Sequence, residues 1–555
     1  MTRSGLFAWL ALAALPGAFV TACQGCHSTP RADSATAAST QGPTLRLYAV
    51  SNLAGALEPC GCTKDQLGGI DHLAAFIAQD RKLAQGSLVV AAGPTMFLDP
   101  KLDVARGAQD RWKGEAISES LADIGLSAWT PGFNDWAGGA PLFSLLAKNT
   151  RAPLVAANLE GVEASKNTLV EVAGVKVGIT GVSAPDYEGA RPAGVEPKDP
   201  TAALKTATAE LRARGAKIVI GLAAVPRGEA LRLAEMVPEL SVLVVGKPSD
   251  GGEANDAPPS PVLVGDVLVI GTSNHLQTVG VIDFFVHGSD FKFQDGTGVA
   301  NVESLLSISK RIHELESRLA SWERNPSIRA EDVAARRGDL AKLRDEKERL
   351  AHPPVPKSGS FFRYSLVEVR ARLGNDPKVE ERMKAYYRRV NDHNRTAFAG
   401  RKPPDVPPGQ SGYIGIDACA NCHDAAKSVW DKTAHARAYA TLSNQFKEFN
   451  LECVSCHVTG YEKPGGSTVT MNASLQDVQC ESCHGPGRAH AKKPDKAGLI
   501  VRDPKPELCA TSCHHPPHVE GFDAAKAKQL IIGPGHGMPE GAPWPAWATD
   551  AGARP

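Results

Sequence analysis

The chain has 555 residues, 61 basic and 61 acidic side chains, and 42% hydrophobic residues. This length exceeds that of one ordinary domain, and the balanced charge excludes the strongly basic composition typical of nucleic-acid-binding proteins. We therefore expect several domains, with no nucleic acid among the partners.

The N-terminus has the pattern of a lipoprotein signal peptide. An apolar run from Leu6 to Val20 leads into Val-Thr-Ala-Cys23, which predicts a signal peptide over 1–22 and a lipidated Cys23. A Ser-, Thr- and Ala-rich flexible tether is expected over 23–42. Gln24, in place of the aspartate that signals inner-membrane retention, favours an exported periplasmic lipoprotein anchored in the outer membrane.

An α/β domain is expected over 43–295. Short apolar runs alternate there with helical patterns such as Ala202 to Arg214, which is typical of buried strands between helices. The predicted strands are Leu45 to Val50, Ser87 to Ala92, Val175 to Gly181, Lys217 to Leu222, Ser241 to Val245 and Val267 to Gly271.

The order of these strands and loops resembles the calcineurin-like metallophosphoesterases, in particular the bacterial 5′-nucleotidase branch. That family holds two metal ions with acidic, amide and histidine ligands in the loops after its strands. The corresponding positions here read Ser51-Asn52-Leu53, Gly93-Pro94, Gly132-Phe133-Asn134-Asp135, Leu222-Ala223-Ala224 and Gly246-Lys247-Pro248. Asp135 and His275 remain, but two cations about 4 Å apart need several such ligands. We expect a scaffold without catalysis, with a metal-dependent phosphohydrolase as an alternative.

Cys60 and Cys62 form an isolated Cys-Gly-Cys within this domain. In an exported protein a thiol pair is oxidised or binds metal, and a disulfide closing so small a ring is easily reduced. Three interpretations stay open: a structural disulfide or pairing, a redox-active pair, and a site for a soft metal.

A helical hairpin is expected over 300–352, because apolar residues recur there at three- and four-residue steps on both sides of Asn325-Pro326. It is either an oligomerisation arm or, as we favour, a self-contained spacer. A connector of one strand (Phe361 to Val369) and one helix (Pro377 to Phe398) is expected over 357–400, and a Pro-rich linker over 401–412.

The C-terminal region, 413–540, repeats the Cys-X-X-Cys-His signature of c-type haem attachment. Two thiols one helical turn apart reach the two vinyl groups of one porphyrin, and the next histidine ligates the iron. Zinc is the other metal that such cysteines hold, but zinc sites do not require histidine directly after the second cysteine. Four motifs are present: Cys419-Ala-Asn-Cys422-His423, Cys453-Val-Ser-Cys456-His457, Cys480-Glu-Ser-Cys483-His484 and the lengthened Cys509-Ala-Thr-Ser-Cys513-His514. We expect four haem c groups; the similar Cys23-Gln-Gly-Cys26-His27 is interpreted as the lipid anchor.

The sequence segments around these motifs resemble a multihaem cytochrome c family, whose best-known member takes electrons from hydroxylamine oxidoreductase in nitrifying bacteria. They include Thr433-Ala434-His435-Ala436, and Gly485-Pro486-Gly487 followed by His490. The resemblance implies His435, His490 and His518 as distal iron ligands, with His536 a weaker candidate.

A multidomain protein is therefore expected: a phosphoesterase-like α/β domain, a helical hairpin and a mostly helical or irregular multihaem domain. Bis-histidine ligation leaves no open iron position and suits electron transfer with redox partner proteins. A haem enzyme that binds a small nitrogen or oxygen species at an open iron is the alternative.

Overall fold

The computed structural model describes residues 42–59, 66–186, 191–247, 255–289, 291–323, 325, 327–351, 356, 358–516, 518–519 and 521–549. The expected signal peptide, Cys23, Cys60 and Cys62 lie outside these residues. The chain divides into two units, residues 1–41 and Gly42–Pro555, and the fold described here is that of the second. No helix of the described residues is long and apolar enough to cross a membrane.

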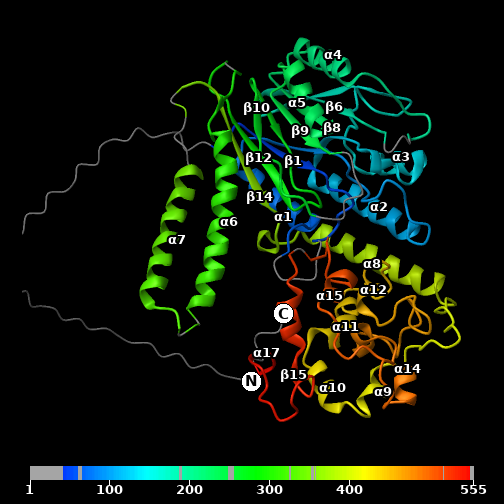
Figure 1. The fold of residues 1–555 in the computed structure, drawn as a ribbon. Coiled ribbons are helices and arrows are strands. Elements are labelled where there is room, and N and C mark those ends of the chain that lie inside the picture. Colours follow the sequence, from blue (N-terminus) through cyan, green and yellow to red (C-terminus); the bar gives the residue numbers. More distant parts are fainter. Residues whose placement is uncertain are drawn as a thin grey trace, which may run out of the picture. The chain divides into compact units, whose positions relative to one another are not determined.

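Two six-stranded sheets form the centre of the α/β domain (Figure 1). The first has the order β13-β14-β12-β1-β2-β3, and the second β10-β11-β9-β8-β6-β5. The first sheet comprises β1 (Leu45–Ser51), β2 (Ser87–Ala92), β3 (Leu126–Thr130), β12 (Thr278–Phe285), β13 (Gln294–Asp295) and β14 (Phe361–Glu368). The second comprises β5 (Asn167–Val172), β6 (Val175–Ser183), β8 (Ile218–Ala224), β9 (Val242–Gly246), β10 (Val262–Val264) and β11 (Val267–Ile270). All six predicted strands are confirmed, within a few residues at their ends.

The alternation of side chains along the strands builds a four-layer sandwich. In β1, Leu45, Leu47 and Ala49 join the core between the sheets, whereas Tyr48 and Val50 join a second core under helices. Successive side chains point to opposite faces of a strand, so strands buried on both faces need helices outside them. Helices α1 (Ile70–Asp80), α2 (Gly107–Ile124), α3 (Gly139–Asn149) and α8 (Pro377–Ala397) cover the first sheet; α4 (Pro200–Ala213) and α5 (Arg227–Met236) cover the second.

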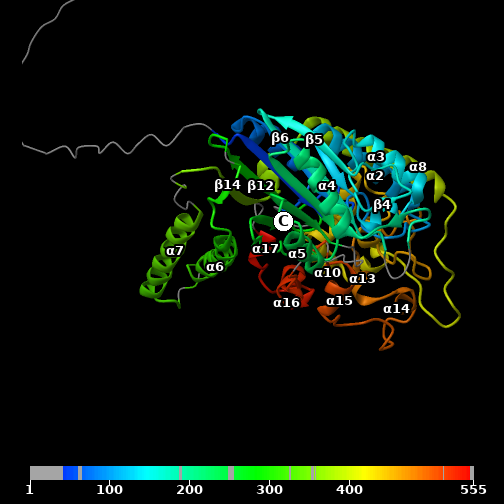
Figure 2. The ribbon, with the colours of Figure 1, turned by 90° about the horizontal axis from the view of Figure 1, so that it is seen from above.

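Helices α6 (Val299–Trp322) and α7 (Ala330–Ala351) form the expected hairpin and run beside each other in both views (Figures 1 and 2). Ile308, Ile312, Leu319 and Leu340 form its small core. The chain then returns to the first sheet, where β14 pairs with β12 from Thr278↔Glu368 to Phe285↔Phe361. The expected end of the α/β domain at residue 295 was therefore wrong: the hairpin is an insertion, and the predicted connector supplies a strand and the helix α8. Pairing between strands so far apart in the sequence leaves no local signal.

The C-terminal region consists of short helices joined by irregular segments, as expected. They are α9 (Ile416–Ala420), α10 (Asp424–Trp430), α11 (Ala438–Ser443), α12 (Val454–His457), α13 (Cys480–His484), α14 (Arg488–Lys492), α15 (Glu507–Ser512), α16 (Ala524–Lys528) and α17 (Ala546–Thr549). The two-residue strands β15 (Gly533–Pro534) and β16 (Gly537–Met538) lie near its end, and β4 (Leu159–Glu160) pairs with β7 (Glu196–Pro197) in the α/β domain.

Candidate functional site

Each cysteine motif begins or lies in a short helix of the C-terminal region. In α13, Cys480 and Cys483 are three residues apart within one helical turn, so both thiols lie on one face and His484 ends the helix. Helices α9, α12 and α15 carry or adjoin the cysteines of the other motifs. All eight motif cysteines are free, and Cys422 is exposed. Each pair of thiols is therefore available for covalent attachment.

Three pairs of rings that each include a motif histidine lie at nearly the same separation. The ring centroids are 6.4 Å apart for His423 and His490, 6.3 Å for His435 and His514, and 6.1 Å for His484 and His536. A metal ion bound between two imidazoles, with metal–nitrogen bonds of about 2 Å, holds the ring centroids roughly 6 Å apart. Each pair joins the histidine of one motif to a histidine outside the motifs, as in bis-histidine ligation of a haem iron.

Hydrogen bonds fix the tautomer of several of these rings. Nδ1 lies 2.6 Å from the Ala438 carbonyl oxygen in His457, 2.6 Å from that of Val501 in His484, and 2.7 Å from that of Ile531 in His536. Since a carbonyl only accepts, Nδ1 carries the proton and donates it, which leaves the lone pair on Nε2 for a metal.

Burial favours the neutral form of four of the histidine rings. It lowers the pKa of His435 to about 4, with His514 contributing further, and it lowers the pKa of His457, His484 and His514 below the ordinary histidine value. A neutral imidazole retains the nitrogen lone pair that coordinates iron.

Two further histidines were candidates for distal ligands. The ring of His518 lies 6.0 Å from that of His515, and its role as a distal ligand stays a prediction. His536, the weaker candidate, occupies the position facing His484. The sequence feature that could have pointed to His536 is the segment Gly-Pro-Gly-His-Gly. This segment forms a turn between β15 and β16, where Gly535 and Gly537 have φ of 81° and 78°. Among the described ring pairs, none includes His457.

The motifs meet in pairs. The thiols of Cys419 and Cys480 share a hydrogen bond that, together with burial, raises the pKa of Cys419. A hydrogen bond from Cys513 to Cys456 lowers the pKa of the Cys456 thiol to about 6. The first motif is thus adjacent to the third, and the second to the fourth.

The core of this region is small for its length. Its buried hydrophobic cluster consists of Val454, Val458 and Val469, with partly buried aromatic and leucine side chains around it. A domain of more than 100 residues ordinarily buries many large apolar side chains. The small core, the free thiol pairs and the ring separations all fit haem c groups in the interior.

Contacts with α2 and α8 tie this region to the α/β domain. Gln109 donates to Asn450 Oδ1 at 3.0 Å, and Asn394 on α8 donates to the Phe449 carbonyl at 2.8 Å. Lys113 lies 2.8 Å from Glu452. Although burial opposes the charged form, Lys113 holds the pKa of Glu452 below its usual value.

The loop residues that were compared with phosphoesterase ligands bind or pack against backbone groups. The Asn52 side chain accepts from Lys247 N at 2.6 Å, and the buried Asp135 accepts from the backbone of Thr95, Met96 and Gly132. A Cβ on Gly93 would lie 2.2 Å from Gly132 N, and one on Gly246 would lie 2.0 Å from the Gly93 oxygen.

Burial raises the pKa of Asp135 to about 6, whereas burial lowers that of His275 to about 4. Among the described residues, no cluster of three or more His, Cys, Asp or Glu side chains could hold a metal ion.

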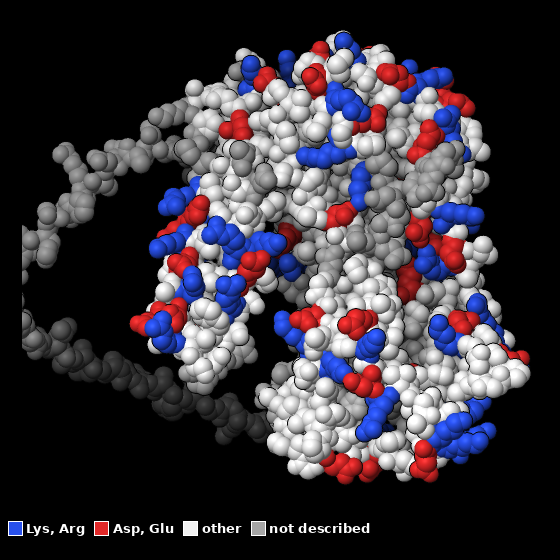
Figure 3. Space-filling view, in the orientation of Figure 1, with Lys and Arg blue, Asp and Glu red and all other residues white. Residues whose placement is uncertain are grey.

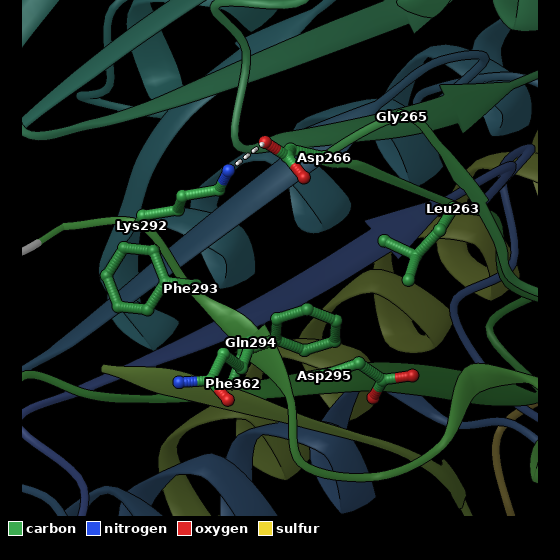
Figure 4. A pocket seen from close by; sticks show the side chains of 8 residues that line it. All are labelled: Leu263, Gly265, Asp266, Lys292, Phe293, Gln294, Asp295 and Phe362. Atoms are coloured by element: carbon green, nitrogen blue, oxygen red, sulfur yellow. Dashed lines mark ion pairs between the residues drawn. The ribbon is translucent and has the colours of Figure 1, made fainter. Parts of the chain in front are cut away.

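A hollow of about 380 Å³ lies elsewhere on this domain, at the edge of the first sheet (Figure 4). Lys292 pairs there with Asp266 at 3.6 Å. Asp295 accepts hydrogen bonds from the backbone of Thr297, Gly298 and Val299, so its carboxylate stabilises the start of α6.

Solved structures and a sequence relative resemble parts of the chain. Among solved structures, the chain is similar to the 5′-nucleotidase precursor of Thermus thermophilus (TM-score 0.42, 16% identity, 72% of this chain and 67% of that chain). It is also similar to the NAD nucleotidase of Haemophilus influenzae (TM-score 0.37, 17% identity, 43% and 52%).

The C-terminal region is 36% identical over 92 residues to cytochrome c-554 of Nitrosomonas europaea. This alignment spans 14% of the chain and 39% of the relative's length. Residues 418–485 match the family Cytochrome c554 and c-prime, and this match implies haem c as a cofactor of that segment.

Proposed function

We propose that the protein is an exported electron-transfer cytochrome that carries four haem c groups. The observation that carries this proposal is the common separation of three histidine ring pairs, 6.1 to 6.4 Å, each joining a motif histidine to a second histidine. Iron held by two histidines has no open position, so such a site exchanges electrons rather than binding a substrate. Haem, when bound, supplies the one-electron chemistry.

The protein's own residues attach and orient the cofactors. The thioether bonds come from the cysteine pairs 419/422, 453/456, 480/483 and 509/513, and the proximal ligands are His423, His457, His484 and His514. His490, His435 and His536 are the proposed distal ligands of the first, fourth and third motifs, because they face His423, His514 and His484. The contacts Cys419–Cys480 and Cys456–Cys513 bring attachment sites together in pairs, which favours electron transfer between neighbouring cofactors.

The α/β domain serves, in this proposal, as a scaffold that has lost phosphoesterase catalysis. Its former ligand positions are occupied by Asn52, which binds backbone, and by glycines packed against neighbouring backbone. Lipidation of Cys23, anchoring in the outer membrane, and redox proteins as partners complete the proposal. Purified protein that hydrolyses a generic phosphoester, and loses this activity on chelation, would contradict the loss of catalysis.

Two measurements test the cytochrome assignment. The intact mass of the mature protein counts attached haems. A mass that corresponds to three haems would show that the fourth motif attaches none. The variants His490→Ala, His435→Ala and His536→Ala should each convert one low-spin haem to high spin in the electron paramagnetic resonance spectrum. His287→Ala, in the α/β domain, is the control and should leave the spectrum unchanged. His518→Ala tests the expectation from the sequence that His518 is also a distal ligand. A new high-spin signal in this variant would support that expectation.

A second candidate function is binding of a small nitrogen or oxygen species at the iron held by His457. It requires that this iron has no second protein ligand. A high-spin ferric signal that is lost in His457→Ala, with nitric oxide binding by the native protein, would support it. A fully low-spin native protein would exclude it.

A further inference from the structure

A basic segment crosses the surface beside two of the proposed haem sites. Residues 488–505 contain six basic and two acidic side chains, in a chain whose total charge balances. All six basic residues are exposed: Arg488, Lys492, Lys493, Lys496, Arg502 and Lys505. Figure 3 shows blue side chains gathered at the lower right, over the place that α14 occupies in Figure 1.

This segment is attached directly to the histidine pairs. It begins in α14, which carries His490, the residue facing His423. It returns to α13 where Val501 N donates to the His484 carbonyl at 2.9 Å and His484 Nδ1 donates to the Val501 carbonyl at 2.6 Å. A molecule seated on the segment would therefore lie beside the iron sites of the first and third motifs.

The positive charges of the segment are largely uncompensated. In the described part of the chain, Lys492, Lys493, Lys496, Arg502 and Lys505 make no ion pair, and Asp503 is already paired with Lys528 at 2.8 Å. Exposed charges of one sign raise the encounter rate of an oppositely charged partner, and this effect declines with ionic strength.

We infer that the surface of residues 488–505 is the docking site for an acidic redox protein, which exchanges electrons with the haems of the first and third motifs. This inference rests on the proposed electron-transfer function and adds the place and chemistry of the partner. A protein partner is favoured over an anionic membrane, because the segment's helix has only five residues and its one large exposed apolar side chain is Val501.

The test measures the rate of electron transfer from a reduced acidic flavodoxin to the full-length haem-loaded protein by stopped-flow absorbance. The rate constant of the native protein should fall with rising ionic strength. The variant Lys492→Glu/Lys493→Glu/Lys496→Glu should be slower by about tenfold or more at low ionic strength. The matched control Lys310→Glu/Lys342→Glu/Lys347→Glu changes the same number of exposed lysines on the hairpin and should lose less than twofold.

Photoreduced lumiflavin, an uncharged donor, separates this inference from the proposed function. Equal reduction of all three proteins by lumiflavin, with a flavodoxin defect confined to the 492/493/496 variant, supports the docking site. Equal flavodoxin rates in both variants would overturn it, as would a variant that loses binding to phosphatidylglycerol vesicles while keeping its flavodoxin rate. A native protein that neither donor reduces would instead overturn the proposed electron-transfer function.

Discussion

The α/β domain and the C-terminal region of this chain stabilise their folds in different ways. In the α/β domain, strands such as β8 are buried along their whole length, and three hydrophobic clusters lie between and outside the sheets. In the C-terminal region the helices have four to seven residues, shorter than an isolated helix needs to be stable in water, and the hydrophobic cluster contains three valines. Apolar side chains suffice for the first region, whereas we expect the second to depend on the proposed haem groups.

The polar groups of the two regions differ in the same way. In the α/β domain, Asp135 and Asn52 bind backbone groups of neighbouring loops, so these two side chains have partners within the domain. In the C-terminal region, Nδ1 of His457, His484 and His536 binds a carbonyl oxygen and leaves Nε2 for another partner. The polar side chains of the α/β domain thus stabilise its loops, whereas the histidines of the C-terminal region keep a nitrogen available for a ligand.

Removal of haem should produce the largest difference in stability between the two regions. Replacing the eight motif cysteines by alanine prevents attachment, so we expect the α/β domain to stay folded while residues after 413 unfold. Limited trypsin digestion with mass spectrometry should give a protected fragment ending near α8. A C-terminal region equally protected in this variant and in the native chain would contradict the comparison.

A large core side chain should matter far more in the α/β domain than an exposed one in the C-terminal region. Trp129 is 0% exposed, so Trp129→Ala should lower the free energy of unfolding by about 3–5 kcal/mol. Trp544 is 37% exposed, and Trp544→Ala should cost about 1 kcal/mol or less. Urea unfolding followed by circular dichroism measures both, and equal losses would show that cofactors do not replace the side-chain core.

The pH dependence of stability tests the closed loops of the α/β domain. Burial raises the pKa of Asp135 from 3.8 to about 6, so the folded chain binds more protons than the unfolded chain between those values. The free energy of unfolding should therefore fall by about 3 kcal/mol as the pH rises through this interval.

Asp135→Asn removes the titrating group, and urea unfolding at several pH values should show that fall disappear. An unchanged pH profile in the variant would mean that Asp135 stays ionised in the folded chain throughout.

The smallest expected effect concerns α8, which contacts both regions. Asp376 caps this helix by accepting from the backbone of Lys378 and Val379, so Asp376→Ala should cost about 1 kcal/mol. Glu381→Ala, an exposed carboxylate on the same helix, is the control and should change stability by less than half as much. Thermal unfolding measures both, and a shift in the haem spectrum of Asp376→Ala would show that α8 also positions a cofactor.

Much of the fold was predictable, because buried strands and paired helices have local patterns. The apolar runs at Ser87 to Ala92 and Val175 to Gly181 correspond to β2 and β6, and the heptad-like steps after residue 300 correspond to α6 and α7. β12 and the return of β14 to the sheet were not predicted, because a strand's partner depends on the folded chain.

The sequence by itself predicted which residues would attach and ligate haem in each motif, because two cysteines and a histidine at this spacing reach one cofactor through local geometry alone. It could not decide which second histidine faces each motif. Only the tertiary structure brought His490 to His423, His435 to His514 and His536 to His484, since these partners lie 52 to 79 residues apart or come from irregular segments that no periodic pattern positions.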